Sequence, residues 1–306
     1  MLMQRVWSIW IRWAATTSVN YYDAMRPRLL LGQGLNMSSK RKQEDVDRKK
    51  YWNEDYVRYW KSRVEEANES KGNASHMVEG DVKTTTDDLY LNAIDLLKIT
   101  KSDHVLEIGC GFGRSLNTLC GVALHVTATD ISEQMIVAAK QACQESNIAF
   151  HVSPSEDLPF PDESFDVVVC FAAFDAMYQA EALIEMNRVC RPGARVLITG
   201  KNDNYHDDDT PAMAAEIGAR EKNHPNYFTD VVKLVRNINE FGFGIETQRY
   251  YQRRGDFANE TAYTEMPERF YEYLLVLRKT DGCHATGDFR ISEKISKTHC
   301  RQGAVS

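Results

Sequence analysis

Short apolar runs alternate with amphipathic segments along residues 104–200, and this alternation restricts the chain to a narrow group of folds. Segments such as "SEQMIVAAKQACQES" (132–146) have the apolar spacing of a helix that covers a core with one face. The apolar runs between such segments are short enough to be strands. Strands that alternate with helices favour a doubly wound, mostly parallel α/β sheet. The predicted strands are 104–109, 124–130, 148–152, 165–174 and 195–200.

The rest of the chain extends this pattern on both sides. "TDVVKLVRNINEFGF" is predicted to be a helix that stops at Gly242, and β-rich stretches follow near 244–251 and 269–279. The turn "RPGA" precedes the strand at 195–200. Residues 86–99 have the pattern of an amphipathic helix, with Thr86 or Asp87 as its cap. The sequence therefore predicts one main domain over residues 86–280.

Residues 37–85 are predicted to form N-terminal helices outside the main domain. Within them, "EDVDRKKYWNEDYVRYWKSRVEEAN" (44–68) carries one aromatic stripe on an otherwise charged surface. The stripe can pack against the sheet domain, or it can cap a pocket and exclude water from it. Its members recur at three- and four-residue steps and are Trp52, Tyr56, Tyr59 and Trp60.

Both ends of the chain differ from the predicted domain. Residues 1–36 hold one acid, Asp23, against four arginines, which is typical of a mitochondrial transit peptide; the alternative is an upstream extension before a start at Met37. The predicted location is the cytoplasm, or the mitochondrion if residues 1–36 are a targeting signal. Residues 281–306 are polar and irregular and are predicted to be disordered.

Composition excludes several classes of protein. The formal net charge of −7 argues against general affinity for nucleic acid, because the phosphate backbone favours clustered Lys and Arg. No segment approaches the ~20 apolar residues that span a bilayer. The seven cysteines show no C-x-x-C spacing, which indicates a reducing compartment and neither a disulfide scaffold nor a zinc site. The sequence does not indicate an oligomeric state.

A glycine-rich turn follows the first predicted strand in "VLEIGCGFGR" (105–114). In open α/β sheets the ligand lies at the carboxyl ends of the strands, and the first strand-to-helix turn lines the site. The alternating glycines Gly109, Gly111 and Gly113 let the backbone approach a ligand, and a helix beginning near Gly113 would present free N–H groups. The alternative for this segment is a purely structural turn.

Asp130 ends the second predicted strand, 17 residues after Gly113 (130 − 113). A carboxylate at this position can accept both hydroxyls of a ribose. The alternative is a helix N-cap, although Ser132 already provides one. The glycine spacing also departs from the dinucleotide pattern G-x-G-x-x-G, because Arg114 stands near where the third small residue should pack. This spacing disfavours NAD.

Four separated motifs together resemble the class I S-adenosylmethionine-dependent methyltransferases, in the branch that includes ubiquinone and menaquinone biosynthesis enzymes. The motifs are "VLEIGCGFGR", "TATDIS", "SEDLPFPDESFDVVVC" and "EMNRVCRPGARVLITG". The resemblance is strong over residues 86–200 and continues to about 280 by element order only. It implies a Rossmann-like fold with a seven-stranded sheet and S-adenosyl-L-methionine as the cofactor.

The resemblance also implies roles for individual residues. Glu107 and the glycine loop would hold the methionine end of the cofactor, Asp130 would bind its ribose, and Ile131 would pack on the adenine. Relatives often have Gly-Asp-Ala where this chain has Ser153, Pro154 and Ser155, so the adenine contact falls to Ser155, Glu156 or the backbone. Phe171 would lie near the sulfonium. The predicted cofactor-binding residues are Glu107, Gly109, Cys110, Gly111, Gly113, Asp130, Ile131, Ser155, Glu156 and Phe171.

The predicted catalytic candidates follow the fourth and fifth strands. Asp175 lies in "FDAMYQ" and is either a site residue or the cap of the next helix. His206 lies in the polar segment 200–213 and can serve as a general base beside a carboxylate. The acids of that segment can also bind a divalent cation that orients a catechol-like acceptor, or form a solvated loop.

The sequence therefore predicts a methyltransferase that transfers a methyl group to a small-molecule acceptor by in-line displacement. A base is needed only if the acceptor arrives protonated. The acceptor atom, whether oxygen, nitrogen or carbon, is not readable from these residues. One alternative is an NAD(P)-dependent reductase, and another is a non-catalytic member that binds the cofactor or a partner protein.

Overall fold

The computed structural model describes residues 39–59, 61, 92–221, 228–257 and 261–280. The chain divides into two compact units, residues 1–43 and 44–306, and the sheet lies in the second. Several sequence predictions lie outside the described residues: the N-terminal extension, Trp60, the cap at Thr86 or Asp87, and the tail from 281.

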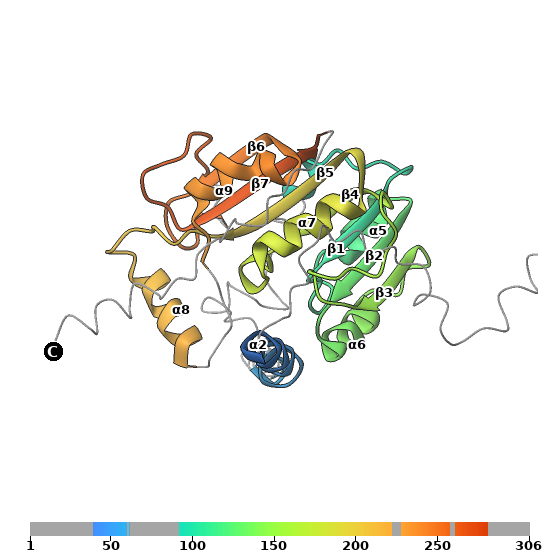
Figure 1. The fold of residues 1–306 in the computed structure, drawn as a ribbon, viewed down its shortest axis with the longest axis horizontal. Helices are drawn as coiled ribbons and strands as arrows, with labels where there is room; N and C mark the ends of the chain where they lie inside the picture. Colours follow the sequence, from blue (N-terminus) through green and yellow to red (C-terminus); the bar gives the residue numbers. More distant parts are fainter. Residues whose placement is uncertain (1–38, 60, 62–91, 222–227, 258–260, 281–306) are drawn as a thin grey trace, which may run out of the picture. The chain divides into compact units, whose positions relative to one another are not determined.

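Seven strands form one sheet in the order β3-β2-β1-β4-β5-β7-β6 (Figure 1). The first five strands are parallel, β7 runs antiparallel to β5, and β6 runs antiparallel to β7. The predicted seven-stranded, mostly parallel sheet is therefore confirmed. The strands are β1 (His104–Ile108), β2 (His125–Asp130), β3 (Ile148–Val152), β4 (Phe165–Cys170), β5 (Cys190–Lys201), β6 (Phe243–Tyr251) and β7 (Glu272–Lys279).

Helices cover both faces of the sheet, as a doubly wound fold requires. Helices α5 (Leu116–Val122) and α6 (Glu133–Ala142) pack with Val105 and its neighbours into one apolar cluster. Helices α7 (Gln179–Val189) and α9 (Val231–Asn237) pack with Leu106 and other strand residues into a second cluster (Figure 1). Successive residues of a strand point to opposite faces, so strands such as β1, β4 and β7 supply both cores.

Two predicted helix boundaries are explained by capping residues. The Ser132 side chain accepts a hydrogen bond of 3.2 Å from the Met135 N–H and caps α6 as predicted. The short 3₁₀ helix η3 (Ile238–Phe241) extends α9 and ends at Gly242, whose φ of 74° is left-handed. The predicted stop at Gly242 is therefore confirmed.

Three predicted boundaries are wrong. Helix α5 begins at Leu116, so turn residues lie where a helix N-terminus was expected near Gly113. Strand β4 ends at Cys170 because the next residues turn into the 3₁₀ helix η2 (Phe174–Ala176), and Ala172 has a φ of 48°. "RPGA" belongs to β5, where it forms an irregularity in the pairing with β4.

The segment at 200–213 contains the start of a helix that the sequence analysis missed. Helix α8 (Thr210–Glu221) follows only eight residues after β5, and the Asp209 carboxylate accepts the Ala212 N–H at 3.1 Å. Asp209 is buried and acts as a cap, so the segment is only partly the solvated loop considered above.

The N-terminal helix is not uniform. Helix α2 (Ser39–Lys50) passes into a π-helical turn, η1 (Tyr51–Asp55), before α-helical geometry resumes at Tyr56. A π turn shifts the helical register, so Tyr51 and Val57 are both buried. The helix that bears the aromatic stripe therefore packs through Tyr51 and Val57, which lie outside the stripe, whereas Trp52 and Tyr56 are half-buried and Tyr59 is exposed.

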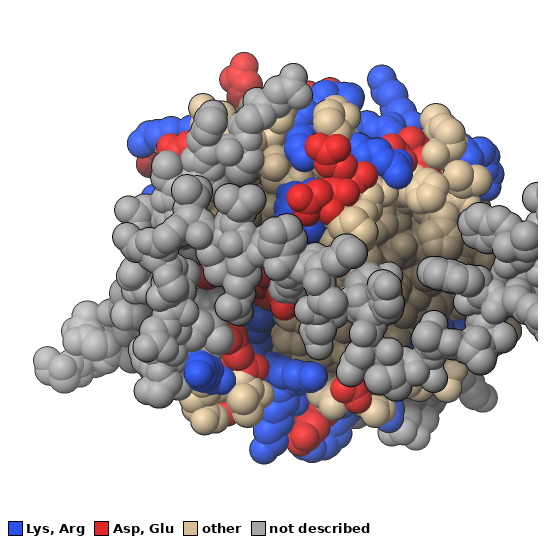
Figure 2. Space-filling view, turned by 45° about the vertical axis from the view of Figure 1, so that its right-hand side comes forward, with Lys and Arg blue, Asp and Glu red and all other residues tan. Residues whose placement is uncertain are grey.

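The described surface that is visible in Figure 2 carries both positively and negatively charged side chains. Figure 2 shows Asp and Glu side chains next to Lys and Arg at the top and bottom of that face, with uncharged surface between them. Within the part of the chain that the structure describes, no helix is long and apolar enough to cross a membrane.

Candidate functional site

A cavity of about 370 Å³ lies at the carboxyl ends of the parallel strands. It borders the ends of β1 and β4, the two neighbouring strands from which the chain continues in opposite directions across the sheet. This is the position at which open α/β sheets bind their ligands. Of the predicted site residues, all except Gly113 and His206 line it: Glu107, Gly109, Cys110, Gly111, Asp130, Ile131, Ser155, Glu156, Phe171 and Asp175.

Gly109 and Gly111 shape the wall of the cavity differently. Gly109 has a φ of 71°, and a Cβ at this position would lie 2.5 Å from the Ala173 Cβ. The glycine therefore lets the loop after β1 pass close to the loop after β4. Gly111 has a φ of 53°, and nothing lies within 4 Å of the place where its Cβ would be. Its N–H donates a hydrogen bond of 2.9 Å to the Asp130 carboxylate.

Gly113 does not line the cavity. Its φ is 90°, and a Cβ here would lie 3.0 Å from the Leu116 side chain and 3.2 Å from the Ala139 backbone of α6. The sequence analysis grouped Gly113 with the cofactor-binding glycines, and the structure assigns it to close packing between the loop and α6. In the dinucleotide pattern G-x-G-x-x-G the third glycine, at the position of Arg114 here, packs against a helix. In this chain Gly113 makes such a packing contact instead.

Glu107 is a buried acid with one unsatisfied oxygen. Its side chain accepts a hydrogen bond from the Ser115 hydroxyl, while its Oε2 has no hydrogen-bond partner among the described residues. Burial raises the pKa of Glu107 to about 7, which the Ser115 hydrogen bond partly opposes and the charge of Asp130 increases. A carboxylate that lines a cavity in this way is suited to a cationic ligand group that donates hydrogen bonds.

Asp130 stands at the end of β2 with its carboxylate held by two backbone N–H groups. Oδ1 accepts the Ser132 N–H at 2.8 Å, and Oδ2 accepts the Gly111 N–H at 2.9 Å. Burial raises its pKa to about 6, although these backbone hydrogen bonds favour the ionised form. Each oxygen keeps further lone-pair capacity toward the cavity, where ligand hydroxyls can donate. Helix α6 is capped by Ser132, so the capping alternative for Asp130 is wrong.

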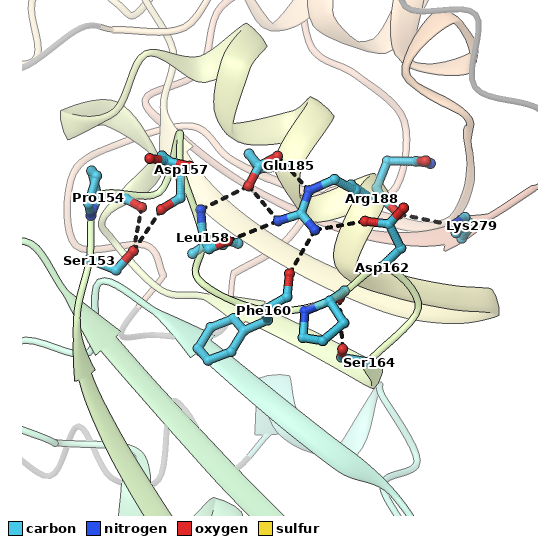
Figure 3. Close-up of polar contacts among 12 residues, drawn as sticks. Ser153, Pro154, Asp157, Leu158, Phe160, Asp162, Ser164, Glu185, Arg188 and Lys279 are labelled. Atoms are coloured by element: carbon cyan, nitrogen blue, oxygen red, sulfur yellow. Dashed lines mark hydrogen bonds and ion pairs between the residues drawn. The ribbon is translucent and has the colours of Figure 1, made fainter. Parts of the chain in front are cut away.

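The loop between β3 and β4 supplies another wall, and a side-chain network fixes its path (Figure 3). The Arg188 guanidinium donates to the backbone oxygens of Leu158 and Phe160, at 3.0 and 2.7 Å. It is held in place by the Glu185 carboxylate, which also accepts the Leu158 N–H at 2.8 Å. Three backbone groups of one loop are thus anchored to α7.

The cavity end of this loop is tightened by Ser153, whose hydroxyl hydrogen-bonds to the oxygens of Pro154 and Asp157 at 3.0 Å each (Figure 3). Ser155 is buried and lines the cavity beside Pro154. The hydroxyl of Ser153 is committed to the loop itself. Ser155 and the local backbone are therefore the groups of this loop that remain available to a ligand.

Glu156 also lines the cavity, but its carboxylate is engaged by other protein groups. Arg48 NH1 and NH2 donate to Oε1 and Oε2 at 2.7 and 2.9 Å, and the Tyr178 N–H donates to Oε1 at 2.7 Å. Burial alone would raise the pKa of Glu156, but its bonds with Arg48 dominate and hold the pKa below its ordinary value. Glu156 therefore acts mainly as the ion-pair partner of Arg48 and is less available than Ser155 to contact a ligand.

Two residues of the aromatic stripe, Trp52 and Tyr56, line the cavity. Their ring centroids lie 4.8 Å apart in an edge-to-face arrangement. Trp52 and Tyr56 thus match the predicted role of a pocket wall, while Tyr59 of the same stripe is exposed. Aromatic walls exclude water and can contact a cation.

The far end of the cavity, at β4, β5 and β7, is lined by Asp175 and Lys201. Both Asp175 oxygens lie 3.0 Å from the backbone nitrogen of Lys201, and the Lys201 Nζ lies 4.0 Å from Oδ2. Burial raises the pKa of Asp175 to about 6 against the effect of Lys201. Asp175 does not cap α7, whose N-cap residue is Tyr178. The predicted alternative of a cap is therefore wrong.

His206, the second predicted catalytic residue, is not brought to the cavity. Its Nε2 is buried without a hydrogen-bond partner among the described residues. The neighbouring acids Asp207 and Asp208 are paired with Arg269 and Arg253, at 2.7 and 2.8 Å. Within the described ranges, no three His, Cys, Asp or Glu side chains gather closely enough to hold a metal ion.

Several lining residues were missed by the sequence analysis. Glu272 and Tyr273 begin β7, and Phe257 lies in the loop after β6. Glu272 had a detectable signal, because it is an acid directly before the apolar run of β7, and Glu107 is likewise an acid within the apolar run of β1. Arg48 had none, because it lies in a uniformly charged helix and its partner is 108 positions away.

Comparison with known proteins identifies the relatives of this domain. Residues 106–198 match the family model described as a methyltransferase domain. A demethylmenaquinone methyltransferase of Tropheryma whipplei is 32% identical over 108 residues, which are 35% of this chain and 45% of the relative. A phosphatidylethanolamine N-methyltransferase of Cereibacter sphaeroides is 32% identical over 136 residues, covering 42% and 65%.

The fold is also that of a solved relative. An S-adenosylmethionine-dependent methyltransferase from Mesorhizobium loti superposes with a TM-score of 0.51 at 18% identity, covering 62% of this chain and 97% of the other. The match supports the fold. This chain covers less than two thirds of the length of these two curated relatives.

Proposed function

We propose that this chain, which carries a class I S-adenosylmethionine-dependent methyltransferase domain, binds that cofactor in its cavity and methylates a small-molecule acceptor. The observation that carries the proposal is that the Oε2 of buried Glu107, in the same cavity as Asp130, has no hydrogen-bond partner among the residues that the structure describes. S-adenosylmethionine has an ammonium and a ribose diol, which are groups that suit two such carboxylates.

The residues of the cavity fit the cofactor from one end to the other. Glu107 would accept from the ammonium, and Asp130 would accept from the two ribose hydroxyls. Ile131 and Ser155 also line the cavity and would contact the adenine. The open surface at Gly111 would let the methionine tail lie against the loop.

When bound, the cofactor supplies an electrophilic methyl group on a sulfonium. The chain has to hold an acceptor atom about 3–3.5 Å from that methyl carbon and in line with the bond that breaks. Phe171, after β4, also lines the cavity, and Trp52 and Tyr56 would exclude water from it.

A small molecule is the acceptor class that these observations favour. The net charge of −7 disfavours nucleic acid as the acceptor. One relative is named for a menaquinone precursor and another for a phospholipid amine, so relatedness supports small acceptors without selecting one. A reductase is disfavoured because Glu107 would repel the pyrophosphate of NAD.

Calorimetric titration of the full chain tests this proposal. S-adenosylmethionine and S-adenosylhomocysteine are expected to bind at one site, and NADH is expected not to bind. Failure of both adenosyl compounds to bind would overturn the proposal, as would tight binding of NADH alone.

A further inference from the structure

A charged group on β5 faces another on β7 at the end of the cavity farthest from Asp130. Lys201, the last residue of β5, pairs directly with Glu272, the first residue of β7. Residues that are paired across antiparallel strands project on the same side of the sheet. Both line the cavity, together with Asp175. This end of the cavity therefore presents two carboxylates and one ammonium to whatever lies beside the cofactor.

Gly200 allows this arrangement. A Cβ at Gly200 would lie 2.6 Å from Asp175 Oδ1 and 2.6 Å from the Tyr273 hydroxyl oxygen. The two side chains therefore lie directly against the backbone of β5. The Tyr273 hydroxyl is already 3.0 Å from the Thr229 hydroxyl, and both Asp175 oxygens are near the Lys201 N–H. Asp175 and Tyr273 are thus committed to the protein.

Glu272 differs from both, because no hydrogen bond from the described residues reaches its carboxylate. The charged groups around it are Lys201 on β5, Asp175 in η2, and Arg254 and Asp256 in the loop after β6. Burial raises the pKa of Glu272 to about 7, against the effect of the two cations. An accessible carboxylate with this pKa takes up and releases a proton near neutral pH, which is what a general base needs.

We propose that Glu272 is the general base for a weakly acidic hydroxyl acceptor, a phenol or an enol, and that Lys201 stabilises the resulting oxyanion. This inference rests on the proposed function of the same cavity. The acceptor hydroxyl lies between the Glu272 carboxylate and the Lys201 ammonium, where one removes its proton and the other holds the negative charge.

The step is balanced within the bound reactants. The hydroxyl proton passes to Glu272, and an oxygen electron pair forms the bond to the methyl carbon. The electron pair of the breaking carbon–sulfur bond returns to sulfur, which loses its positive charge. The products are a methyl ether and S-adenosylhomocysteine, and Glu272 later releases the proton to water.

The charges and walls select this acceptor class over amines. An amine acceptor develops no negative charge for Lys201 to stabilise, whereas a phenol becomes a phenolate that Lys201 stabilises once Glu272 has taken up the proton. Apolar and aromatic side chains also line the cavity, and Phe257 and Met177 are among them. Such walls suit a flat ring that carries one polar group at its edge.

A binding experiment on the full chain saturated with S-adenosylhomocysteine tests the inference. The probe is 4-hydroxyacetophenone, a phenol whose ultraviolet spectrum reports its ionisation, in buffer just above the Glu272 pKa of about 7. The wild type is expected to bind the probe as its phenolate. Calorimetry in buffers of different ionisation enthalpy is expected to show a net release of about half a proton or less per phenolate bound, because Glu272, which is more than half ionised at this pH, accepts the rest.

The variants separate the two roles. Glu272→Gln is expected to release about one proton per phenolate bound, and Lys201→Met to weaken phenolate binding about tenfold or more. Glu265→Gln, an exposed acid before β7, is the control and is expected to behave as the wild type.

The outcomes also separate this inference from the proposed function. If S-adenosylhomocysteine does not bind, the proposed function fails. If it binds but the phenol does not, or if proton release is the same in wild type and Glu272→Gln, the inference is overturned while the proposed function stands.

Discussion

Arg48 and Glu156 are joined by two hydrogen bonds of 2.7 and 2.9 Å although 108 positions separate them in the chain. Their side chains are only 7% and 11% exposed, and the Arg48 guanidinium lies 4.3 Å from the centroid of the Tyr178 ring. The pair connects the helix that bears Trp52 to the loop that bears Ser155. Two walls of the cavity are thereby fixed to each other.

Replacing one partner of this pair should be costly. Arg48→Met leaves the Glu156 carboxylate buried without its cation, and we expect the free energy of unfolding to fall by about 3–5 kcal/mol. Urea denaturation measures this change. Lys49→Met is the matched control, because its partner Glu133 is 4.0 Å away and both side chains are more than half exposed. That control should change stability by at most about 1 kcal/mol.

A double substitution distinguishes the charge from the packing. In Arg48→Met/Glu156→Gln the uncompensated charge is removed, so much of the lost stability should return. If the single and double variants are equally unstable, the ion pair does not explain the contribution of Arg48, and its packing on Tyr178 does.

Asp130→Asn should weaken S-adenosylmethionine binding about 10- to 100-fold, because a neutral amide replaces a charged acceptor of the ribose hydroxyls. Calorimetry gives the affinity, and urea denaturation checks that the Gly111 and Ser132 contacts still support the fold. Asp162→Asn is the control, since Asp162 contacts Arg188 outside the cavity and is 75% exposed. An unchanged affinity in Asp130→Asn would refute the ribose assignment.

Much of the fold and of the cofactor side of the cavity was predictable because it depends on local patterns. Apolar runs define the strands, and Asp130 is identified because it stands where one such run ends. Ser132 was recognisable as a cap for the same reason. Glu107 was noticeable because an acid inside an apolar strand needs a partner, and one of its oxygens has none within the described part of the chain.

The remaining site depends on tertiary contacts that no local pattern encodes. His206 follows β5 closely in sequence, but a bridge between Asn202 and Thr229 redirects the chain, and α8 then begins at Thr210. Lys201 and Glu272 are 71 positions apart (272 − 201) and meet only because β7 pairs antiparallel with β5. Gly113 was misassigned because a packing glycine and a ligand-facing glycine have the same local spacing.

The affinity for S-adenosylmethionine should depend on pH through Glu107. Its pKa of about 7 exceeds its ordinary value of 4.5, so the free protein loses stability as the pH rises between these values, because the carboxyl ionises in the unfolded chain before it ionises in the folded one. Only the ionised form attracts the ammonium of the ligand. Below the pKa the affinity should therefore fall about tenfold for each pH unit, as measured by calorimetry across this range.

Glu107→Gln tests the source of this dependence. The variant should bind more weakly above pH 7 and should lose most of the slope below it, because the amide does not titrate. Asp130 contributes a smaller slope near its own pKa of about 6. A full slope in Glu107→Gln would assign the pH dependence to another group.

Alanine substitutions at the loop glycines should have different consequences. Gly109→Ala combines a left-handed φ, which costs about 1–2 kcal/mol, with an overlap against Ala173 that costs about 1–3 kcal/mol more. Gly111→Ala carries only the first cost, since its Cβ would point into open space. We therefore expect Gly109→Ala to lose more folding stability in urea denaturation.

Ligand binding should separate the same pair of variants in a second way. The Cβ of Gly111→Ala would occupy space in the cavity beside the loop, so the folded variant should bind S-adenosylmethionine at least about tenfold more weakly. Gly218→Ala is the control: it lies inside α8, its Cβ would meet nothing within 4 Å, and it should gain up to about 1 kcal/mol of stability. Normal binding in Gly111→Ala would place the methionine tail away from this part of the loop, because a ligand lying against Gly111 cannot share that space with a methyl group.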